Sequence, residues 1–286
     1  MMNLKIIDNN FEIIEIENKF ASAKIALQGG HIYHYQAKGS APLLWLSSAN
    51  EFVLGKAIRG GVPICWPWFG MNKDDENLPQ HGFARTSLFS LHSALELEDG
   101  RDRVVLRLGD SKESRALWNY KFELFIEFDI GASLEIRLIT NNMDEEAFEI
   151  TQALHTYFEV SNIEDVIITG LEERPYFDAL TQEKMQQKGV IRFNKEVDRV
   201  YQDANKKIVL KDASHSVEIK NSGSNSVVVW NPWVEKSKRM SMMNDDAYKT
   251  MVCIETANAL DDVKSVRAAE HYILGVQLFS PLIKVF

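Results

Sequence analysis

Two side chains that lie far apart in the sequence could together move protons on a substrate. His155 lies among apolar neighbours in Ala153–Phe158, and Glu255 lies at the end of the apolar run in Met251–Ala257. Histidine and glutamate commonly act as general acids and bases. Spacing alone favours structural roles, because a core imidazole can be hydrogen-bonded and a strand carboxylate can point outward or pair with an arginine.

Two arginines flank a segment whose composition is typical of a shaped loop. Arg59–Gly70 combines tryptophan, glycine and proline, and Gln80–Arg85 follows after a polar stretch. Such segments often form the rim of a binding cleft. Arg59 and Arg85 could point into one cleft, where a guanidinium offers an anion paired and permanently charged donors. The commoner fate of an arginine is a surface position or a salt bridge.

Other polar side chains are candidates for binding a ligand. They are Gln80, His81 and Asp198. The candidates for an aromatic wall are Trp66, Trp68, Phe69 and Trp233. At least half of these rings are expected in the core instead. The run Glu235–Lys238 is expected to be a solvated loop, with Lys236 or Lys238 near a phosphate as the less favoured alternative.

No motif predicts a metal, a nucleotide or another cofactor. His31 and His34 are three residues apart, but no third ligand with zinc-like spacing follows, so one inward and one outward imidazole is expected. Phosphate-binding and dinucleotide-binding glycine motifs are absent, as are Cys-x-x-Cys pairs and Gly-x-Ser-x-Gly. Cys65 and Cys253 cannot form a disulfide framework, and they are expected to be reduced and partly buried.

Composition places the chain among ordinary globular proteins. The 286 residues include 32 Lys and Arg against 41 Asp and Glu, a net charge of −9, which argues against a nucleic-acid partner. No stretch is apolar over the ~18 residues that a membrane-spanning helix needs. The N-terminal residues show no signal peptide. We therefore expect a cytoplasmic protein without a membrane partner.

The elements that would position these residues are strands. Phe122–Asp129 alternates apolar and acidic residues, and Leu134–Leu138 repeats the pattern after a short turn, which predicts a hairpin. Similar runs occur at Phe11–Glu17, Ala23–Leu27, Val104–Leu108, Ala147–Leu154, Val166–Thr169, Lys207–Leu210, Ser216–Ile219, Val227–Trp230, Met251–Glu255 and Tyr272–Leu278. Short helical turns are expected near Ala49–Leu54 and Ser111–Leu117, and a charged loop over Val234–Asp246. The pattern predicts one antiparallel β domain over residues 1–286, a sandwich or a barrel.

An ordered set of short motifs resembles the aldose 1-epimerase superfamily, and within it the hexose-6-phosphate mutarotases (glucose-6-phosphate 1-epimerases). The motifs are Gln28–His31, Arg59–Gly70, His81–Arg85, Leu154–Phe158, Val197–Tyr201, Trp230–Trp233 and Cys253–Asn258. They extend over nearly the whole chain. The free-sugar galactose mutarotases carry an Asn directly before the catalytic His and another soon after it. Leu154 and Glu159 stand near His155 here, which favours the phosphosugar branch.

The resemblance implies an all-β fold, the antiparallel β-supersandwich of the galactose mutarotase type. It implies that His155 is the general acid and Glu255 the general base, which requires a protonated His155 and an unprotonated Glu255 at rest. Arg59, Gln80, His81, Arg85 and Asp198 match substrate-contacting positions, and Trp233 is a further candidate.

The expected reaction is anomer interconversion of a hexose 6-phosphate by a monomeric isomerase that needs no cofactor. The alternatives are an epimerase of free hexoses and a non-catalytic carbohydrate-binding protein on the same fold.

Overall fold

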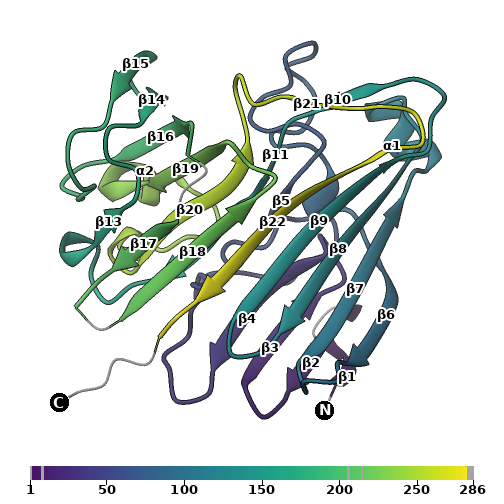
Figure 1. Ribbon diagram of the computed structural model, residues 1–286, viewed down its shortest axis with the longest axis horizontal. Coiled ribbons are helices and arrows are strands. Elements are labelled where there is room, and N and C mark those ends of the chain that lie inside the picture. Colours follow the sequence, from purple (N-terminus) through teal and green to yellow (C-terminus); the bar gives the residue numbers. More distant parts are fainter. Residues whose placement is uncertain (1, 8–9, 205–206, 214, 282–286) are drawn as a thin grey trace.

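The regular structure is almost entirely antiparallel β-sheet (Figure 1). The computed structural model describes residues 2–7, 10–204, 207–213 and 215–281. Two eight-stranded sheets, a four-stranded sheet and a two-stranded ribbon make up the fold. This confirms the all-β antiparallel supersandwich expected from the sequence.

The longest strands belong to an eight-stranded sheet that faces the viewer in Figure 1. In spatial order they are β13 (Ile167–Thr169), β17 (Ile208–Lys211), β18 (Ser216–Ser222), β22 (His271–Phe279), β9 (Leu134–Asn142), β8 (Phe122–Ile130), β7 (Asp102–Gly109) and β6 (Ser90–Glu96). The predicted hairpin is β8–β9. Its alternation buries Phe122, Leu124 and Ile126 completely on one face, because successive strand residues point to opposite faces.

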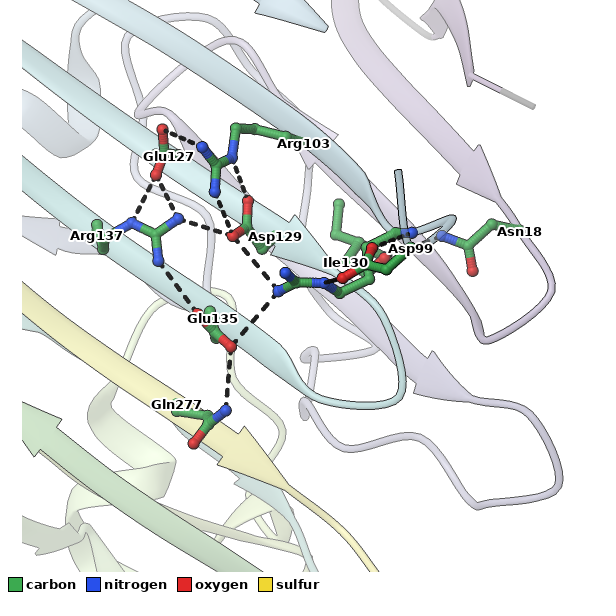
Figure 2. Close-up of polar contacts among 10 residues, drawn as sticks. Asn18, Asp99, Arg103, Glu127, Asp129, Ile130, Glu135, Arg137 and Gln277 are labelled. Carbon is green, nitrogen blue, oxygen red and sulfur yellow. Dashed lines mark hydrogen bonds and ion pairs between the residues drawn. The ribbon is translucent and has the colours of Figure 1, made fainter. Parts of the chain in front are cut away.

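The opposite face of this sheet carries a charge ladder, which we define as Arg103, Glu127, Asp129, Glu135, Arg137 and Gln277 (Figure 2). Arg103 lies across from Asp129, and Glu127 lies across from Arg137 in the strand register. Arg103 donates to both Asp129 oxygens at 2.6 and 2.7 Å, and Arg137 donates to the same carboxylate at 2.8 Å. Opposite charges on neighbouring strands thus bind β7, β8 and β9 together.

The second eight-stranded sheet holds most of the segments that the sequence marked as chemical. Its spatial order is β15 (Glu183–Gln186), β14 (Pro175–Asp178), β16 (Val197–Gln202), β19 (Ser226–Asn231), β20 (Met251–Asn258), β11 (Gln152–Leu154) and β5 (Ile64–Cys65), with β12 (Tyr157–Glu159) also paired to β20. Every residue of β19 and β20 is buried. Fully buried strands read as continuous apolar runs, which is the pattern of Val227–Trp230 and Met251–Ile254.

The third sheet consists of β1 (Met2–Ile7), β2 (Phe11–Glu17), β3 (Ala21–Ala26) and β4 (His31–Ala37), and it lies behind β6–β9 in Figure 1. Tyr35 of β4 donates a hydrogen bond to the Gly131 carbonyl at the β8–β9 turn, at 2.8 Å. One apolar core joins these sheets. Burial of the apolar side chains in this core supplies the main driving force for packing the sheets against one another.

The predicted run Ala147–Leu154 is correct in position, but it is not one strand. It forms β10 (Phe148–Ile150), which pairs with β21 (Lys264–Val266), and then β11 in a different sheet. Between them the Thr151 hydroxyl accepts a hydrogen bond from Phe69 N at 2.9 Å. The loop interaction at Thr151 therefore separates two short strands that local alternation could not distinguish.

Two short α-helices are present in the described ranges, α1 (Lys112–Leu117) and α2 (Trp233–Arg239). The described residues also contain 3-10 turns at Ala84–Thr86, Ile163–Asp165 and Ala247–Lys249. The helix expected near Ser111–Leu117 is confirmed as α1. A reciprocal capping box between Ser111 and Ser114 begins it. Neither helix is long and apolar enough to cross a membrane.

Two local predictions were wrong. Residues Ala49–Leu54 form turns and no helix, because the Gln28 amide donates to the Val53 carbonyl at 3.0 Å and accepts from Gly55 N. These contacts satisfy backbone groups that a helix would pair internally. The charged segment Val234–Asp246 begins as α2 rather than as a loop, after the Asn231 side chain accepts a hydrogen bond from Trp233 N at 2.9 Å.

Candidate active site

His155 and Glu255 come together because their strands are neighbours. Leu154 at the end of β11 pairs with Thr256 of β20, which brings the next residue, His155, to Glu255. His155 Nε2 lies 3.2 Å from Glu255 Oε1, and the side chains are 13% and 2% exposed. The backbone N of His155 donates to Pro63 O at 3.0 Å, which ties the histidine to the loop of Arg59–Gly70.

A cleft of about 950 Å³ opens over this pair. That volume suits a small organic ligand. The predicted site residues that line it are Arg59, Gln80, His81, Arg85, His155, Asp198 and Glu255. Trp233 is not among the lining residues; its ring packs against Tyr248 at a centroid distance of 5.1 Å.

The aromatic candidates divide between core and cleft. Trp66 and Trp68 are buried in the main core, where Trp66 donates to Thr140 at 3.0 Å. Phe69 lines the cleft, as does Trp230, which the sequence analysis did not single out as a wall residue. Core packing of at least half of the predicted rings is therefore confirmed.

Glycines allow the two flanking loops to approach their neighbours closely. Gly82 has a φ of +71°, and a Cβ on it would lie 2.0 Å from the Trp66 carbonyl oxygen. Gly61 has a φ of +61°, and its Cβ would lie 2.4 Å from the Ile32 carbonyl oxygen. Only glycine fits such positions without strain. Arg59, two residues before Gly61, and His81, directly before Gly82, both line the cleft.

His81 is held as a neutral imidazole of known tautomer. Its Nδ1 accepts a hydrogen bond from Gly70 N at 3.1 Å, so the proton of the neutral ring is on Nε2. Burial, and then the cations Arg85 and Arg59, lower the pKa of His81 to about 3. Its ring lies 6.1 Å from the His155 ring, centroid to centroid. His81 therefore offers the cleft a hydrogen-bond donor rather than a charge.

The protonation states of the central pair differ from the expected ones. Burial lowers the pKa of His155, with His81 and Arg85 acting in the same direction. Burial also raises the pKa of Glu255, and the nearby Asp198 carboxylate raises it further, while Arg85 opposes the shift. Both shifts favour neutral forms, and the sequence analysis expected a charged pair at rest. The cause is the removal of both groups from water by the surrounding strands.

The cleft carries cations without carboxylate partners. Among the ion pairs of the described residues, none involves Arg59, Arg85 or Lys73, and all three line the cleft. Arg85 donates to the Gln80 carbonyl at 2.6 Å instead. In the rest of the described chain, arginines such as Arg103, Arg107 and Arg137 are paired. Unpaired cations in a concave site indicate an anionic ligand.

A fourth cation, Lys236, lies at the cleft but is already paired. Its Nζ is 3.1 Å from Glu196 and 3.6 Å from Asp198, and it lies 5.7 Å from the centre of the Trp230 ring. Burial raises the pKa of Asp198, and Lys236 opposes this shift. A phosphate contact from Lys236 or Lys238 was the less favoured prediction for Glu235–Lys238. Lys236 lines the cleft and Lys238 does not.

Lys73 and Tyr157 were missed as cleft residues. Lys73 lies in a polar loop with no distinctive spacing, and Tyr157 lies inside the motif Leu154–Phe158, where only the histidine was given a role. The motif itself was the available signal for Tyr157, since alternation puts residues 155 and 157 on one side of an extended segment.

The histidine pair His31 and His34 splits as predicted. His31 is fully buried and hydrogen-bonded through Nε2 to the Gly60 carbonyl at 2.7 Å, whereas His34 is half-buried beside Ser22. Cys65 and Cys253 are free and completely buried, beyond the partial burial that was expected. In the described residues no three His, Cys, Asp or Glu side chains form a group that could hold a metal.

Known proteins resemble this chain over most of its length. The family model "Aldose 1-epimerase" matches residues 12–277. An Escherichia coli (strain K12) protein named "Putative glucose-6-phosphate 1-epimerase" is 36% identical over 260 residues, which cover 90% of this chain and 86% of that one.

Solved structures show the same likeness. The crystal structure of a "putative mutarotase (YeaD)" from Salmonella typhimurium superposes with a TM-score of 0.90 at 32% identity, covering 98% of this chain and 93% of that one. A galactose mutarotase related enzyme from Lactobacillus acidophilus shares the fold, with a TM-score of 0.76 at 16% identity over 94% of this chain and 97% of that one.

Proposed function

Because the chain belongs to the aldose 1-epimerase family, we propose that it interconverts the α and β anomers of hexose 6-phosphates, with glucose 6-phosphate as the first substrate to test. Family membership makes it a carbohydrate epimerase. The names of the relatives point to the 6-phosphate. The observation that carries the proposal is the presence, in one cleft, of the His155–Glu255 pair and the unpaired cations Arg59 and Arg85.

The proposed chemistry is ring opening and reclosure. One group of the pair removes the proton of the C1 hydroxyl while the other protonates the ring oxygen, and the C1–O5 bond breaks to give the open-chain aldehyde. Rotation about C1–C2 presents the other aldehyde face. Closure returns both protons and gives the opposite anomer. For ring opening, we assign Glu255 as the base that takes the C1 hydroxyl proton and His155 as the acid that protonates the ring oxygen.

The neutral character of the pair suits a reversible reaction. Nε2 of His155 and Oε1 of Glu255 are close enough to share one proton, and its transfer converts the neutral pair into carboxylate and imidazolium with no change of net charge. Each group must give a proton in one half of the cycle and take one in the other. Shifts of both pKa values towards the neutral form make the uncharged pair more favourable in the cleft than it is in water.

The remaining lining residues supply binding contacts in the proposal. Arg59 and Arg85 bind the phosphate, with Lys73 as a third cation at the rim. His81 donates through Nε2 to a sugar oxygen, and Gln80 and Asp198 bind sugar hydroxyls. The active unit in this proposal is a monomer of one domain over residues 1–286.

Exchange spectroscopy by proton NMR tests the proposal. The α-anomeric proton of equilibrated glucose 6-phosphate is saturated with and without the protein, and glucose is measured in a parallel tube. We expect transfer of saturation to the β signal in the phosphate tube alone. Equal transfer in both tubes would support an epimerase of free hexoses. Absence of transfer in both tubes, with mannose and galactose 6-phosphate also inert, would overturn the proposal and favour a carbohydrate-binding protein.

A further inference from the structure

Tyr157 lies between the two functional parts of the cleft. Its ring is stacked on the His155 imidazole, with centroids 4.8 Å apart and planes within 11°. The Arg59 guanidinium lies beside its hydroxyl, where it opposes the effect of burial on the tyrosine pKa. Tyr157 lines the cleft and is only 2% exposed. One rigid side chain therefore touches both the candidate proton donor and the candidate phosphate ligand.

The position of Tyr157 is fixed by its surroundings. Its backbone N donates to Gly61 O at 2.9 Å, and its carbonyl accepts from Trp45 N at 3.0 Å. The Trp45 ring is nearly parallel to it at 5.8 Å, and the Trp230 ring meets it edge-on at 6.0 Å. Strand pairing places it opposite Cys253 of β20. The ring has little freedom to turn away from His155.

The stacked tyrosine ring affects the protonation of His155. The face of an aromatic ring attracts a cation within about 6 Å of its centre, so the stack favours the imidazolium form. The titratable groups that face His155 from the other elements are Glu255, whose Oε1 lies 3.2 Å from Nε2, and His81, Arg85 and Arg59, which favour the neutral ring. Tyr157 thus acts against the burial and the cations that favour a neutral ring.

The hydroxyl of Tyr157 affects Arg59. The Tyr157 hydroxyl lies within hydrogen-bonding reach of the Arg59 guanidinium. The buried Nε of Arg59 makes no hydrogen bond, so this contact is made by another part of the guanidinium. Burial raises the pKa of the hydroxyl, which stays protonated and neutral. An arginine held in one geometry loses less freedom when it binds a phosphate.

We propose that Tyr157 is a positioning residue that couples phosphate binding by Arg59 to proton transfer by His155. The proposal rests on the function proposed above. The tyrosine ring fixes the plane of the His155 imidazole and favours its imidazolium form. The tyrosine hydroxyl fixes the orientation of the Arg59 guanidinium. These two tasks belong to different atoms of one side chain, so they can be removed separately.

Two substitutions separate the tasks. Tyr157→Phe keeps the stacked ring and removes the hydroxyl, so we expect KM for glucose 6-phosphate to rise about 3- to 10-fold with kcat nearly unchanged. Tyr157→Leu removes the ring, so we expect kcat to fall by roughly 10-fold or more, because small misplacements of reacting groups are costly. Tyr157→Met, which fills more of the space, replaces the leucine variant if that variant does not fold.

A titration independent of turnover accompanies the kinetics. The His155 ring protons are assigned by comparison with His155→Gln and followed by NMR against pH. We expect the midpoint to move to lower pH in Tyr157→Leu and to stay in place in Tyr157→Phe. Tyr35→Phe serves as the control, since it removes a buried hydroxyl bond outside the cleft and should change neither kinetics nor titration.

The outcomes are distinct. Equal kinetic changes in Tyr157→Phe and Tyr157→Leu, or a His155 midpoint that does not move when the ring is lost, would overturn the coupling role. If the wild-type protein exchanges no hexose phosphate anomers, the proposed function fails. The His155 titration and the affinity for inorganic phosphate then still measure what the ring and the hydroxyl do.

Discussion

The charge ladder on the outer sheet face and the His155–Glu255 pair in the cleft bury carboxylates in opposite ways. Asp129 receives hydrogen bonds from Arg103 and Arg137, which outweigh the effect of burial and hold its pKa below the usual range. Glu255 has one partner, and its Oε2 atom makes no hydrogen bond. Its pKa is raised, first by burial. The ladder is a satisfied structural network, whereas the cleft keeps an acid under-satisfied, as proton transfer requires.

Cations show the same contrast. In the ladder, arginines are neutralised by strand neighbours placed opposite them in the register (Figure 2). In the cleft, Arg59 and Arg85 have no carboxylate partner among the described residues. A fold that pairs the charges on a sheet face and leaves the arginines of the cleft loops without carboxylate partners separates stability from binding.

The largest expected effect comes from Glu255→Gln. The amide keeps the shape of the side chain but cannot exchange the proton, so anomer exchange should fall about 10²- to 10⁴-fold while sugar phosphate binding changes little. Saturation transfer gives the rate, and calorimetry gives the affinity. Near-wild-type exchange would remove Glu255 from the chemistry and would break the contrast with Asp129.

Asp129→Asn is the matched change in the ladder. It leaves two arginines without their shared carboxylate, and we expect a loss of about 2–3 kcal/mol in the free energy of unfolding. The value lies below that of a fully buried pair because Arg103 and Arg137 are 31% and 28% exposed. Urea unfolding measures it. Asp99→Asn, in a pair whose acid is 55% exposed, is the control and should cost much less stability than Asp129→Asn.

Arg85→Ala sharpens the comparison of cations. Losing a charged hydrogen bond to phosphate should raise KM for glucose 6-phosphate roughly tenfold or more. The affinity for glucose should stay unchanged. Arg107→Ala, on the outer sheet face beside Glu123, is the control and should leave both sugars unaffected. Equal weakening for both sugars would show that Arg85 does not read the phosphate.

The two carboxylates should also give stability opposite dependences on pH. Glu255 has a raised folded-state pKa, so its contribution is full below its ordinary value of 4.5 and is lost as pH rises through the folded value. Asp129 has a lowered pKa, so its contribution is present above 3.8 and is lost as pH falls through the folded value.

Relative to wild type, Glu255→Gln should therefore gain stability as pH rises, at a limit of about 1.4 kcal/mol per pH unit for one proton. The deficit of Asp129→Asn should shrink in acid. Urea unfolding of the three proteins across a pH series measures both slopes. Parallel curves for all three proteins would contradict the assignment of opposite shifts.

Local patterns in the sequence determined many of the strands, but strands such as β4, β6 and β16 were not predicted. Alternation in Phe122–Asp129 and the apolar run through Met251–Ile254 each follow from which faces of a strand are buried. The helix expected at Ala49–Leu54 failed because Gln28, distant in the sequence, binds the backbone there. Propensity describes a segment by itself, and a hydrogen bond from another part of the chain can override it.

The sequence by itself also determined the main candidates for chemistry, His155 and Glu255, and five further residues of the cleft lining, Arg59, Gln80, His81, Arg85 and Asp198. Only the tertiary structure decided that Trp233 lies outside the lining, that Tyr157 stacks on His155, and that burial favours neutral forms of the central pair. The physical reason is that a residue's type fixes its chemistry, whereas its pKa and its partners depend on solvent exclusion and on charges brought close by strands far apart in the chain.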